Sequence, residues 1–286
     1  MTDDRIITIV EVGPRDGLQN EKDVISTEDK LRLIELLADA GLTRIEVTAF
    51  VSPKWVPQMA DHDAVMRRAS RRPGLLLSAL VPNEKGAAAA IAAGAQELAV
   101  FASASETFAL KNTNCTIAES IERFKPVLAL AKAHALPVRG YVSCAVDCPY
   151  EGAIPPSAAR GVSERLLEIG CREIAVADTI GRATPERIDM MLKQVIKSVP
   201  VDQLACHFHD TSGQALADVD VALEHGVRTF DSAVGGLGGC PYAPGAAGNL
   251  ATERLVLHLQ HTGFVTSVDP AKLRAAVAHT LPFARR

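Results

Sequence analysis

Several targeting signals are missing from the 286-residue sequence. The first residues, MTDDRIITIVEV, lack both the cationic region with a following apolar run of a signal peptide and the many arginines of a transit peptide. No apolar stretch is long enough to span a membrane. The last residues, LPFARR, match no lipidation or retention signal. We therefore expect a cytoplasmic protein without a membrane partner.

The sequence also lacks an excess of basic residues. Its 30 lysines and arginines stand against 34 aspartates and glutamates, which gives a formal net charge of -4. Nucleic acid is therefore not an expected partner. Hydrophobic residues make up 48% of the chain, enough to bury a large core, and charged residues make up 22%. This composition is typical of a globular protein.

Cysteine is scarce, and no pair has a recognisable spacing. None of the six cysteines forms a C-x-x-C motif, so neither a zinc knuckle nor a redox pair is predicted. A chain of this length does not need disulfides to fold. We expect most of the thiols to be small apolar fillers of the core. Cys240, in a glycine-rich segment, is the exception considered below.

Eight short apolar runs alternate with longer amphipathic segments. Runs that are apolar almost throughout are typical of parallel strands covered on both faces. The expected strands cover residues 6–12, 44–49, 75–81, 96–102, 137–143, 172–178, 203–209 and 228–234. The expected helices cover residues 27–41, 83–94, 116–134, 157–170, 184–198, 213–226 and 246–261. We place the caps of the first two helices at Thr27 and Asn83.

Eight strands, each followed by a helix, are the count of a (β/α)₈ TIM barrel, and eight strands that alternate with helical segments therefore predict this α/β fold. An open doubly wound sheet is the alternative, and it would usually carry G-x-G-x-x-G after its first strand. The first strand here runs into EVGPRDGLQNEK, which lacks that motif. No linker or change in composition divides the sequence. We therefore expect residues 1–286 to form a single catalytic barrel domain with a short C-terminal helical extension.

Polar residues gather at the carboxyl ends of the expected strands. They are Arg15, Asp16, Glu46, Ser143, Asp178, His207 and His209. The active sites of such barrels lie at the face where the strands end. We therefore predict that these side chains line one site.

The segment HFHD suggests a metal site. Side chains alternate along a strand, so His207 and His209 share a face, where two imidazoles can hold a divalent cation. Hydrogen-bonded core histidines are the alternative. Asp16 and Asn249 follow the two neighbouring strands and would add oxygen ligands. With no thiolate in the set, Mg²⁺ or Mn²⁺ is favoured over structural zinc. Asp210 alternates to the other face, and we expect it to support the loop.

Arg15 and a glycine-rich segment complete the expected site. Arg15 either forms an ion pair with Glu46 or Asp178, or serves as a fixed cation that stabilises an enolate oxygen. The segment GGLGGCPYAPGAAGN (235–249) is interpreted as a mobile loop that closes over the site. A flexible turn or a phosphate cradle is the alternative, although G-K-[ST] is absent. Cys240 would enter the site on closure and move a proton or attack.

Seven stretches together resemble a known family of enzymes. They are EVGPRDGLQNEK, IEVTAFVSPKWVPQMAD, FASASETFALKNTNCTI, YVSCAVDCPYEG, DTIGRATP, HFHDTSGQALAD and VGGLGGCPYAPGAAGNLATE. They cover most of the chain and resemble the 3-hydroxy-3-methylglutaryl-CoA lyase family. More broadly, the chain is similar to metal-dependent barrel enzymes that make or break carbon–carbon bonds by Claisen or aldol chemistry.

The resemblance implies a (β/α)₈ barrel, a divalent cation and an acyl-CoA substrate. The metal ligands that it implies are Asp16, His207, His209 and Asn249. The catalytic residues expected from the pattern of residues are Arg15, Cys240 and His207, and the resemblance adds Asp178 and Glu46. His207 and Asp178 are the candidate bases. The expected substrate-binding residues are Arg15, Gln19, Lys111 and Asn112.

The expected reaction is a metal-dependent retro-Claisen cleavage of 3-hydroxy-3-methylglutaryl-CoA to acetoacetate and acetyl-CoA. Phe208, Ser212 and Ala177 depart from residues common in the family, which leaves open a longer-branched substrate of the isohexenyl type. A synthase that runs the reaction in reverse, an aldolase of the same barrel group and a non-catalytic metal-binding barrel are further alternatives. Barrels of this kind are often dimers, so a homodimer stays open.

Overall fold

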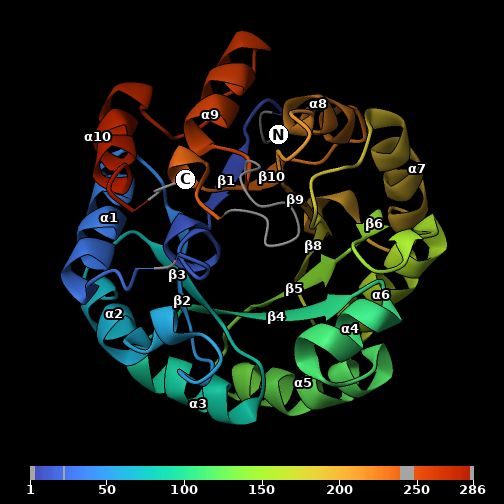
Figure 1. The fold of residues 1–286 in the computed structure, drawn as a ribbon, viewed down its shortest axis with the longest axis horizontal. Coiled ribbons are helices and arrows are strands. Elements are labelled where there is room, and N and C mark those ends of the chain that lie inside the picture. The colour runs from blue at the N-terminus through green and yellow to red at the C-terminus, as the bar shows by residue number, and fades with distance from the viewer. Residues whose placement is uncertain (1–3, 22, 239–247, 284–286) are drawn as a thin grey trace.

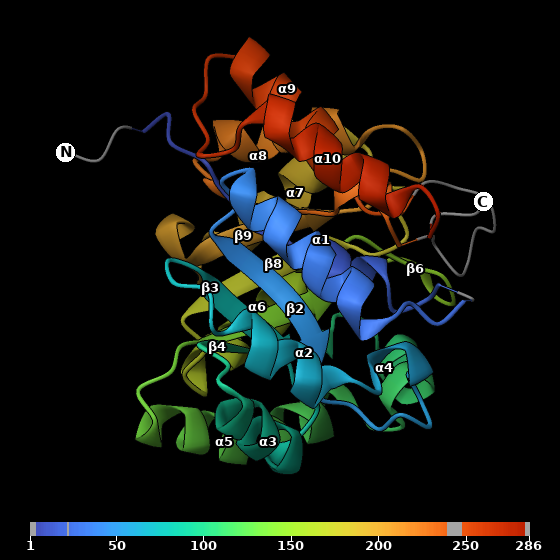
Figure 2. The ribbon, with the colours of Figure 1, turned by 90° about the vertical axis from the view of Figure 1, so that its left-hand side faces the viewer.

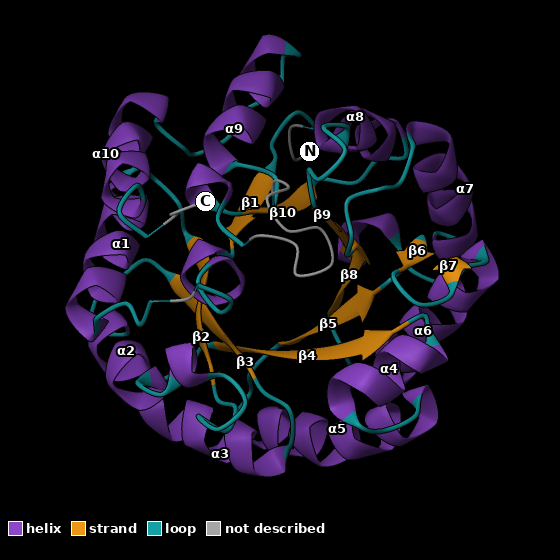
Figure 3. Cartoon of the chain, in the orientation of Figure 1, coloured by secondary structure: helices purple, strands orange, loops and turns teal. Residues whose placement is uncertain are grey.

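A computed structural model describes residues 4–21, 23–238 and 248–283 (Figure 1). Eight parallel strands close into a barrel in the order β1-β10-β9-β8-β5-β4-β3-β2, and helices surround them (Figure 3). The closed barrel confirms the expected fold and excludes the open sheet. In the described parts of the chain, no helix is long and apolar enough to cross a membrane.

All eight expected strands are present, and their ends shift by up to two residues. The barrel strands are β1 (Thr8–Glu11), β2 (Arg44–Ala49), β3 (Leu76–Leu80), β4 (Glu97–Ser103), β5 (Val138–Ser143), β8 (Glu173–Asp178), β9 (Leu204–Phe208) and β10 (Thr229–Ser232). Nearly all of their residues are buried, as expected for strands covered on both faces. A small antiparallel hairpin of β6 (Asp147–Cys148) and β7 (Gly152–Ala153) follows β5 and was not expected.

The expected helices are also present, together with two that the sequence patterns missed and one in the segment expected to form a short C-terminal helical extension. The expected ones are α1 (Thr27–Asp39), α3 (Glu84–Ala93), α5 (Ile117–Ala133), α6 (Pro156–Glu168), α7 (Pro185–Val195), α8 (Ala215–Glu224) and α9 (Thr252–His261). The additional ones are α2 (His62–Ala69), α4 (Glu106–Thr113) and α10 (Pro270–Thr280). Helix α10 lies beside α1 on the outside of the barrel (Figure 2).

One expected helix cap and one expected helix start were wrong. The side chain of Ser26, not Thr27, accepts from the amide of Asp29 and caps α1, whereas the hydroxyl of Thr27 donates to Asp61 instead. The last expected helix begins at Thr252 rather than at 246, because the residues just before it continue as extended chain and form bridges to β9 and to the end of β10. The cap at Asn83 is confirmed.

Candidate active site

The first strand leads into a short π-helix, η1 (Gly13–Gly17), that carries Arg15 and Asp16 to the carboxyl end of the barrel. The two carboxylate oxygens of Asp16 have different partners. Oδ1 accepts from Nη1 of Arg15 at 2.6 Å and from Nε2 of Gln19 at 3.0 Å. Oδ2 accepts from Nδ2 of Asn249 at 2.8 Å. The second oxygen also faces the two histidines.

The histidines at the end of β9 share a face, as the alternation of side chains predicts. Nε2 of His207 and Nε2 of His209 each lie 4.0 Å from Oδ2 of Asp16. One ligand atom from each of the three residues falls within 4.8 Å of the others. The side chains are only 7%, 12% and 16% exposed for His207, His209 and Asp16. Three potential metal ligands therefore converge in a largely buried place.

The protonation states of this cluster suit a cation. Burial favours the neutral form of Asp16, but Arg15 and the two histidines outweigh it and hold the pKa of the carboxyl well below its usual range. Burial and the neighbouring His207 lower the pKa of His209 to about 4. At neutral pH the cluster therefore offers a carboxylate and an unprotonated imidazole, the forms that bind metal ions. The residues present fit a divalent cation.

Asn249 lies beside the cluster because its backbone bridges to His209. Its amide nitrogen donates to Asp16 and, at 3.0 Å, to the carbonyl of Leu237. Gly238 approaches this amide so closely that an added Cβ would lie 2.7 Å from Nδ2. The structure thus brings Asn249 to the site but turns its nitrogen, not its oxygen, toward Asp16.

Arg15 is buried between two carboxylates. Its Nε donates to Glu46 at the barrel wall, and its Nη1 donates to Asp16. Burial alone would lower the pKa of the guanidinium, but Glu46 and Asp16 raise it above its ordinary value. The expected ion pair between Arg15 and Glu46 is therefore present. It also fixes a permanent positive charge beside the proposed metal ligands.

Asp178 does not join the cluster. It pairs in register with Phe208, whereas Ala177 pairs with His207, so Asp178 lies on the opposite face of the sheet from the histidine. Its Oδ2 accepts from the amide of Ala183 at 2.9 Å. Burial raises its pKa to about 6. We therefore infer that Asp178 supports the loop between β8 and α7 and does not take part in the cluster.

Asp210 supports the loop after β9, as expected. Its Oδ1 accepts from the amide of Ala215 at 3.1 Å, at the start of α8, and its Oδ2 pairs with Arg254 of α9. These contacts fix the segment that follows His209. Asp210 thereby holds the loop on which one side of the site depends.

The glycine-rich segment is described only at its two ends, and Cys240 lies outside the described residues. At the first end, Gly235, Gly236 and Gly238 have φ values of 68°, 62° and 96°, which favour glycine. Glu11, at the end of β1, anchors this turn. Its Oε1 accepts from the amides of Gly13 and Val234 at 2.8 and 2.9 Å.

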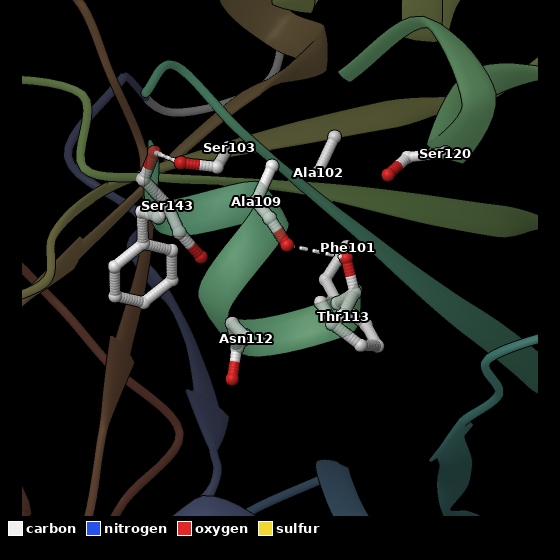
Figure 4. Close-up of a pocket in the computed structure, with 9 residues that line it drawn as sticks. Phe101, Ala102, Ser103, Ala109, Asn112, Thr113, Ser120 and Ser143 are labelled. Atoms are coloured by element: carbon white, nitrogen blue, oxygen red, sulfur yellow. Dashed lines mark hydrogen bonds between the residues drawn. The ribbon is translucent and has the colours of Figure 1, made fainter. Parts of the chain in front are cut away.

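Lys111 and Asn112 lie on α4, at the carboxyl end of β4. Both side chains are exposed, and Nζ of Lys111 lies 3.9 Å from the ring centroid of Tyr150. Asn112 lines a small cavity together with Ser103 and Ser143, which end β4 and β5 (Figure 4). No contact recorded between described residues joins either side chain to Asp16 and the histidines.

Comparison with known proteins places the chain in a family. A model of the HMGL-like family matches residues 6–279. The chain belongs to this family. The mitochondrial hydroxymethylglutaryl-CoA lyase of Gallus gallus is 54% identical over 267 residues, which cover 93% of this chain and 90% of the relative. The expected family is thereby confirmed, and the relatives named hydroxymethylglutaryl-CoA lyase are carbon–carbon lyases.

Solved structures agree with this membership. The HMG-CoA lyase of Brucella melitensis has a TM-score of 0.96 and 52% identity, over 98% of this chain and 99% of that chain. An HMG-CoA lyase from Acinetobacter baumannii, in complex with coenzyme A and 3-methylmalate, has a TM-score of 0.92 and 38% identity. That match covers 99% of this chain and 92% of the other.

Sequence reasoning missed a line of buried polar residues inside the barrel. Arg139 and Tyr141 lie on β5, and Asp231 lies on β10. Arg139 donates to Asp231 at 2.6 and 3.0 Å and to the Tyr141 hydroxyl at 2.9 Å. Tyr141 in turn donates to Glu46 at 3.1 Å. The available signal was the presence of charged residues in the middle of the apolar runs PVRGYVS and RTFDSAV.

Proposed function

We propose that this chain cleaves 3-hydroxy-3-methylglutaryl-CoA to acetoacetate and acetyl-CoA with a divalent cation, Mg²⁺ or Mn²⁺. The observation that carries the proposal is the convergence of Asp16, His207 and His209 beside the buried Arg15. The family and its lyase members support the reaction class. The complex of a relative with coenzyme A supports an acyl-CoA substrate.

Asp16, His207 and His209 would hold the cation, and Asn249 would be the fourth protein ligand once its amide is rotated so that the oxygen, not the nitrogen, faces the cluster. Two imidazoles and oxygen donors without thiolate suit Mg²⁺ or Mn²⁺. A cation bound there would act as a Lewis acid toward the hydroxyl and carboxylate oxygens of the substrate. The two carboxylate oxygens of Asp16 have different partners. Oδ1 accepts from Arg15 and Gln19, whereas Oδ2 faces the histidines and would bind the cation.

Arg15 would stabilise negative charge on the thioester oxygen as the carbon–carbon bond breaks and an enolate forms. Its guanidinium is already fixed by Glu46 and Asp16, so it needs little reorganisation during the reaction. Glu46 would act through Arg15 as a positioning residue. Gln19, bound to the same carboxylate, would complete this wall of the pocket.

The geometry disfavours both candidate bases. Asp178 lies on the other face of the sheet from the histidines. His207 has its Nδ1 within 3.0 Å of Asp231, and its Nε2 is the atom that faces the metal side, so a bound cation leaves it no free lone pair. We therefore propose His207 as a ligand only. Cys240 would take the proton from the C3 hydroxyl as the carbon–carbon bond breaks and return it to the enolate carbon, so that protons balance over the reaction.

Lys111 and Asn112 would contact the CoA part of the substrate. Helix α4 lies at the carboxyl end of β4, on the face of the barrel where the strands end. The exposed ammonium of Lys111 suits the phosphates of CoA.

We further propose that the protein is cytoplasmic and forms a homodimer. Localisation of the tagged chain would test the first statement, and light scattering of the purified protein would test the second.

The test is a product analysis with three substrates. The purified chain is incubated with Mg²⁺ and the methyl substrate, with a long-branched 3-hydroxyglutaryl-CoA, or with a 4-hydroxy-2-oxo acid that an aldolase would cleave. We expect acetyl-CoA and acetoacetate from the methyl substrate at the highest kcat/KM. A preference for the long-branched thioester would replace the substrate, and cleavage of the oxo acid alone would refute the lyase.

A further inference from the structure

His207, one of the two histidines in the site, has a hydrogen-bond partner on the side of its ring that points away from Asp16. Nδ1 of His207 lies 3.0 Å from Oδ2 of Asp231, which is buried on the neighbouring strand β10. The two residues pair in register, so their side chains point to the same face of the barrel wall. This contact lies on the far side of the imidazole from Asp16.

Arg139 clamps the Asp231 carboxylate. Its Nη2 donates to Oδ1 at 2.6 Å, and its Nη1 donates to Oδ2 at 3.0 Å, which is the bidentate geometry of a strong ion pair. Arg139 is itself held by the hydroxyl of Tyr141, and its Nε lies 2.7 Å from Glu173. Each carboxylate oxygen of Asp231 thus accepts from a guanidinium, a group that stays protonated in proteins. Asp231 is therefore an acceptor only.

An acceptor at this place determines which ring nitrogen of His207 carries the proton. Nδ1 must donate to Asp231, and a neutral imidazole with a proton on Nδ1 has its lone pair on Nε2. Nε2 is the atom that lies 4.0 Å from Oδ2 of Asp16. His209 differs, because its buried Nδ1 has no hydrogen-bond partner among the described residues. The constraint therefore applies to His207 alone.

We propose that Asp231, clamped by Arg139, is a positioning residue that holds His207 in the Nδ1–H tautomer and so turns the Nε2 lone pair toward the cation. The inference rests on the proposed function, because it assumes that His207 is a metal ligand. Carboxylates behind ligating histidines typically improve metal affinity, and their loss weakens it about 10- to 100-fold.

The first experiment is nitrogen NMR of the metal-free, full-length wild type with labelled imidazoles, in which His207→Ala identifies the signal of His207. We expect the Nδ1–H tautomer for His207. The Nε2–H tautomer would overturn the proposal. This spectrum uses no variant at Asp231, so it decides the question even where Asp231→Asn fails to fold.

The second experiment is a Mn²⁺ titration, followed by electron paramagnetic resonance, of the wild type and Asp231→Asn. The variant should bind Mn²⁺ about 10- to 100-fold more weakly and show a changed His207 tautomer. The matched control is Asp220→Asn, which removes the carboxylate from another Asp–His pair, 2.6 Å from His258, and should bind like the wild type.

The Mn²⁺ titrations distinguish failure of the positioning role of Asp231 from failure of the metal-dependent lyase function. Wild-type Mn²⁺ affinity in a folded Asp231→Asn would refute the positioning role and leave the lyase proposal intact. Failure of the wild type itself to bind Mn²⁺ would refute the metal-dependent function and with it the purpose assigned to Asp231. The tautomer of His207 would still be read from the spectrum in that case.

Discussion

The two oxygens of Asp16 join the two halves of the site. Oδ1 holds Arg15 and Gln19, and Oδ2 faces His207 and His209. A single carboxylate therefore places a guanidinium next to the proposed metal ligands. Because Arg15 also donates to Glu46, its position is fixed from two sides. The position of the positive charge beside the cation therefore depends on the forked shape of the guanidinium, which donates to Glu46 and Asp16 from separate nitrogens.

Replacement of Arg15 by lysine tests this point. Lysine keeps the charge but cannot donate to Glu46 and Asp16 from separate nitrogens. We expect kcat for acetyl-CoA release to fall about 10²–10³-fold, with Mn²⁺ affinity nearly unchanged. Steady-state kinetics and a Mn²⁺ titration measure the two effects. Arg72→Lys, in a surface pair with Asp39, is the matched control and should keep its kcat. A kcat near wild type in Arg15→Lys would contradict the role of the guanidinium.

At the residue scale, sequence reasoning succeeded where strand alternation applied. His207, His209 and Asp16 were predicted to lie together because each stands at or just beyond the carboxyl end of a strand of the barrel. The same alternation, applied between Ala177 and Asp178, would have put Asp178 on the other face. Asp231 was out of reach, because its role depends on the register of β9 and β10 and on the clamp by Arg139.

Among the elements, the loop after β8 supports the strand that carries the histidines. Gly181 in this loop has a φ of 62°, and an added Cβ would lie 2.8 Å from the carbonyl oxygen of His209 and 2.7 Å from the amide of Thr211. The loop and the end of β9 can approach this closely only without a side chain at 181. The position of His209 therefore depends on a glycine on the neighbouring connection.

Gly181→Ala should accordingly damage both stability and the metal site. We expect the unfolding free energy to fall by about 1–3 kcal/mol from backbone strain alone, and Mn²⁺ binding to weaken because His209 must move. Urea unfolding and a Mn²⁺ titration measure the two effects. Gly161→Ala in α6, where an added Cβ meets nothing within 4 Å, is the control and should leave stability unchanged or raise it. Equal behaviour of both variants would refute the argument.

The elements that sequence patterns missed are short or weakly patterned. Helices α2 and α4 have eight residues each, so their buried stripes have only two or three members. The start of α9 was misplaced because the extended residues before it are stabilised by bridges to other strands, which no local pattern reveals. The eight strands were predictable, because burial on both faces leaves continuous apolar runs.

For the molecule as a whole, the ionisation of a buried carboxyl group makes the free energy of unfolding depend on pH. Glu11 is fully buried under the turn after β10, where its Oε2 accepts from Thr252 at 2.6 Å. Burial raises its pKa to about 7 from an ordinary value of 4.5. Between these pH values the folded chain binds more protons than the unfolded chain, so the contribution of Glu11 to stability is present below pH 4.5 and is lost as the pH rises through 7.

Glu11→Gln should remove this pH dependence. The amide oxygen of glutamine can still accept from the two backbone amides, but the side chain cannot ionise. We expect the stability of the variant, relative to the wild type, to be about 2.5 kcal/mol more favourable at pH 8 than at pH 5. Urea unfolding at both pH values tests it, with the exposed Glu84→Gln as a control. A difference that does not change with pH would contradict the burial argument.

In the proposed reaction, one divalent cation at Asp16, His207 and His209 is required for carbon–carbon cleavage. The most direct measurement is acetyl-CoA release from 3-hydroxy-3-methylglutaryl-CoA while Mn²⁺ is titrated into the EDTA-treated chain. We expect activity to rise in proportion to bound metal and to saturate at one ion per chain. We also expect His209→Ala neither to bind Mn²⁺ nor to gain activity from it. Full activity in the presence of EDTA, or cleavage by His209→Ala at the wild-type rate, would contradict this requirement for the cation.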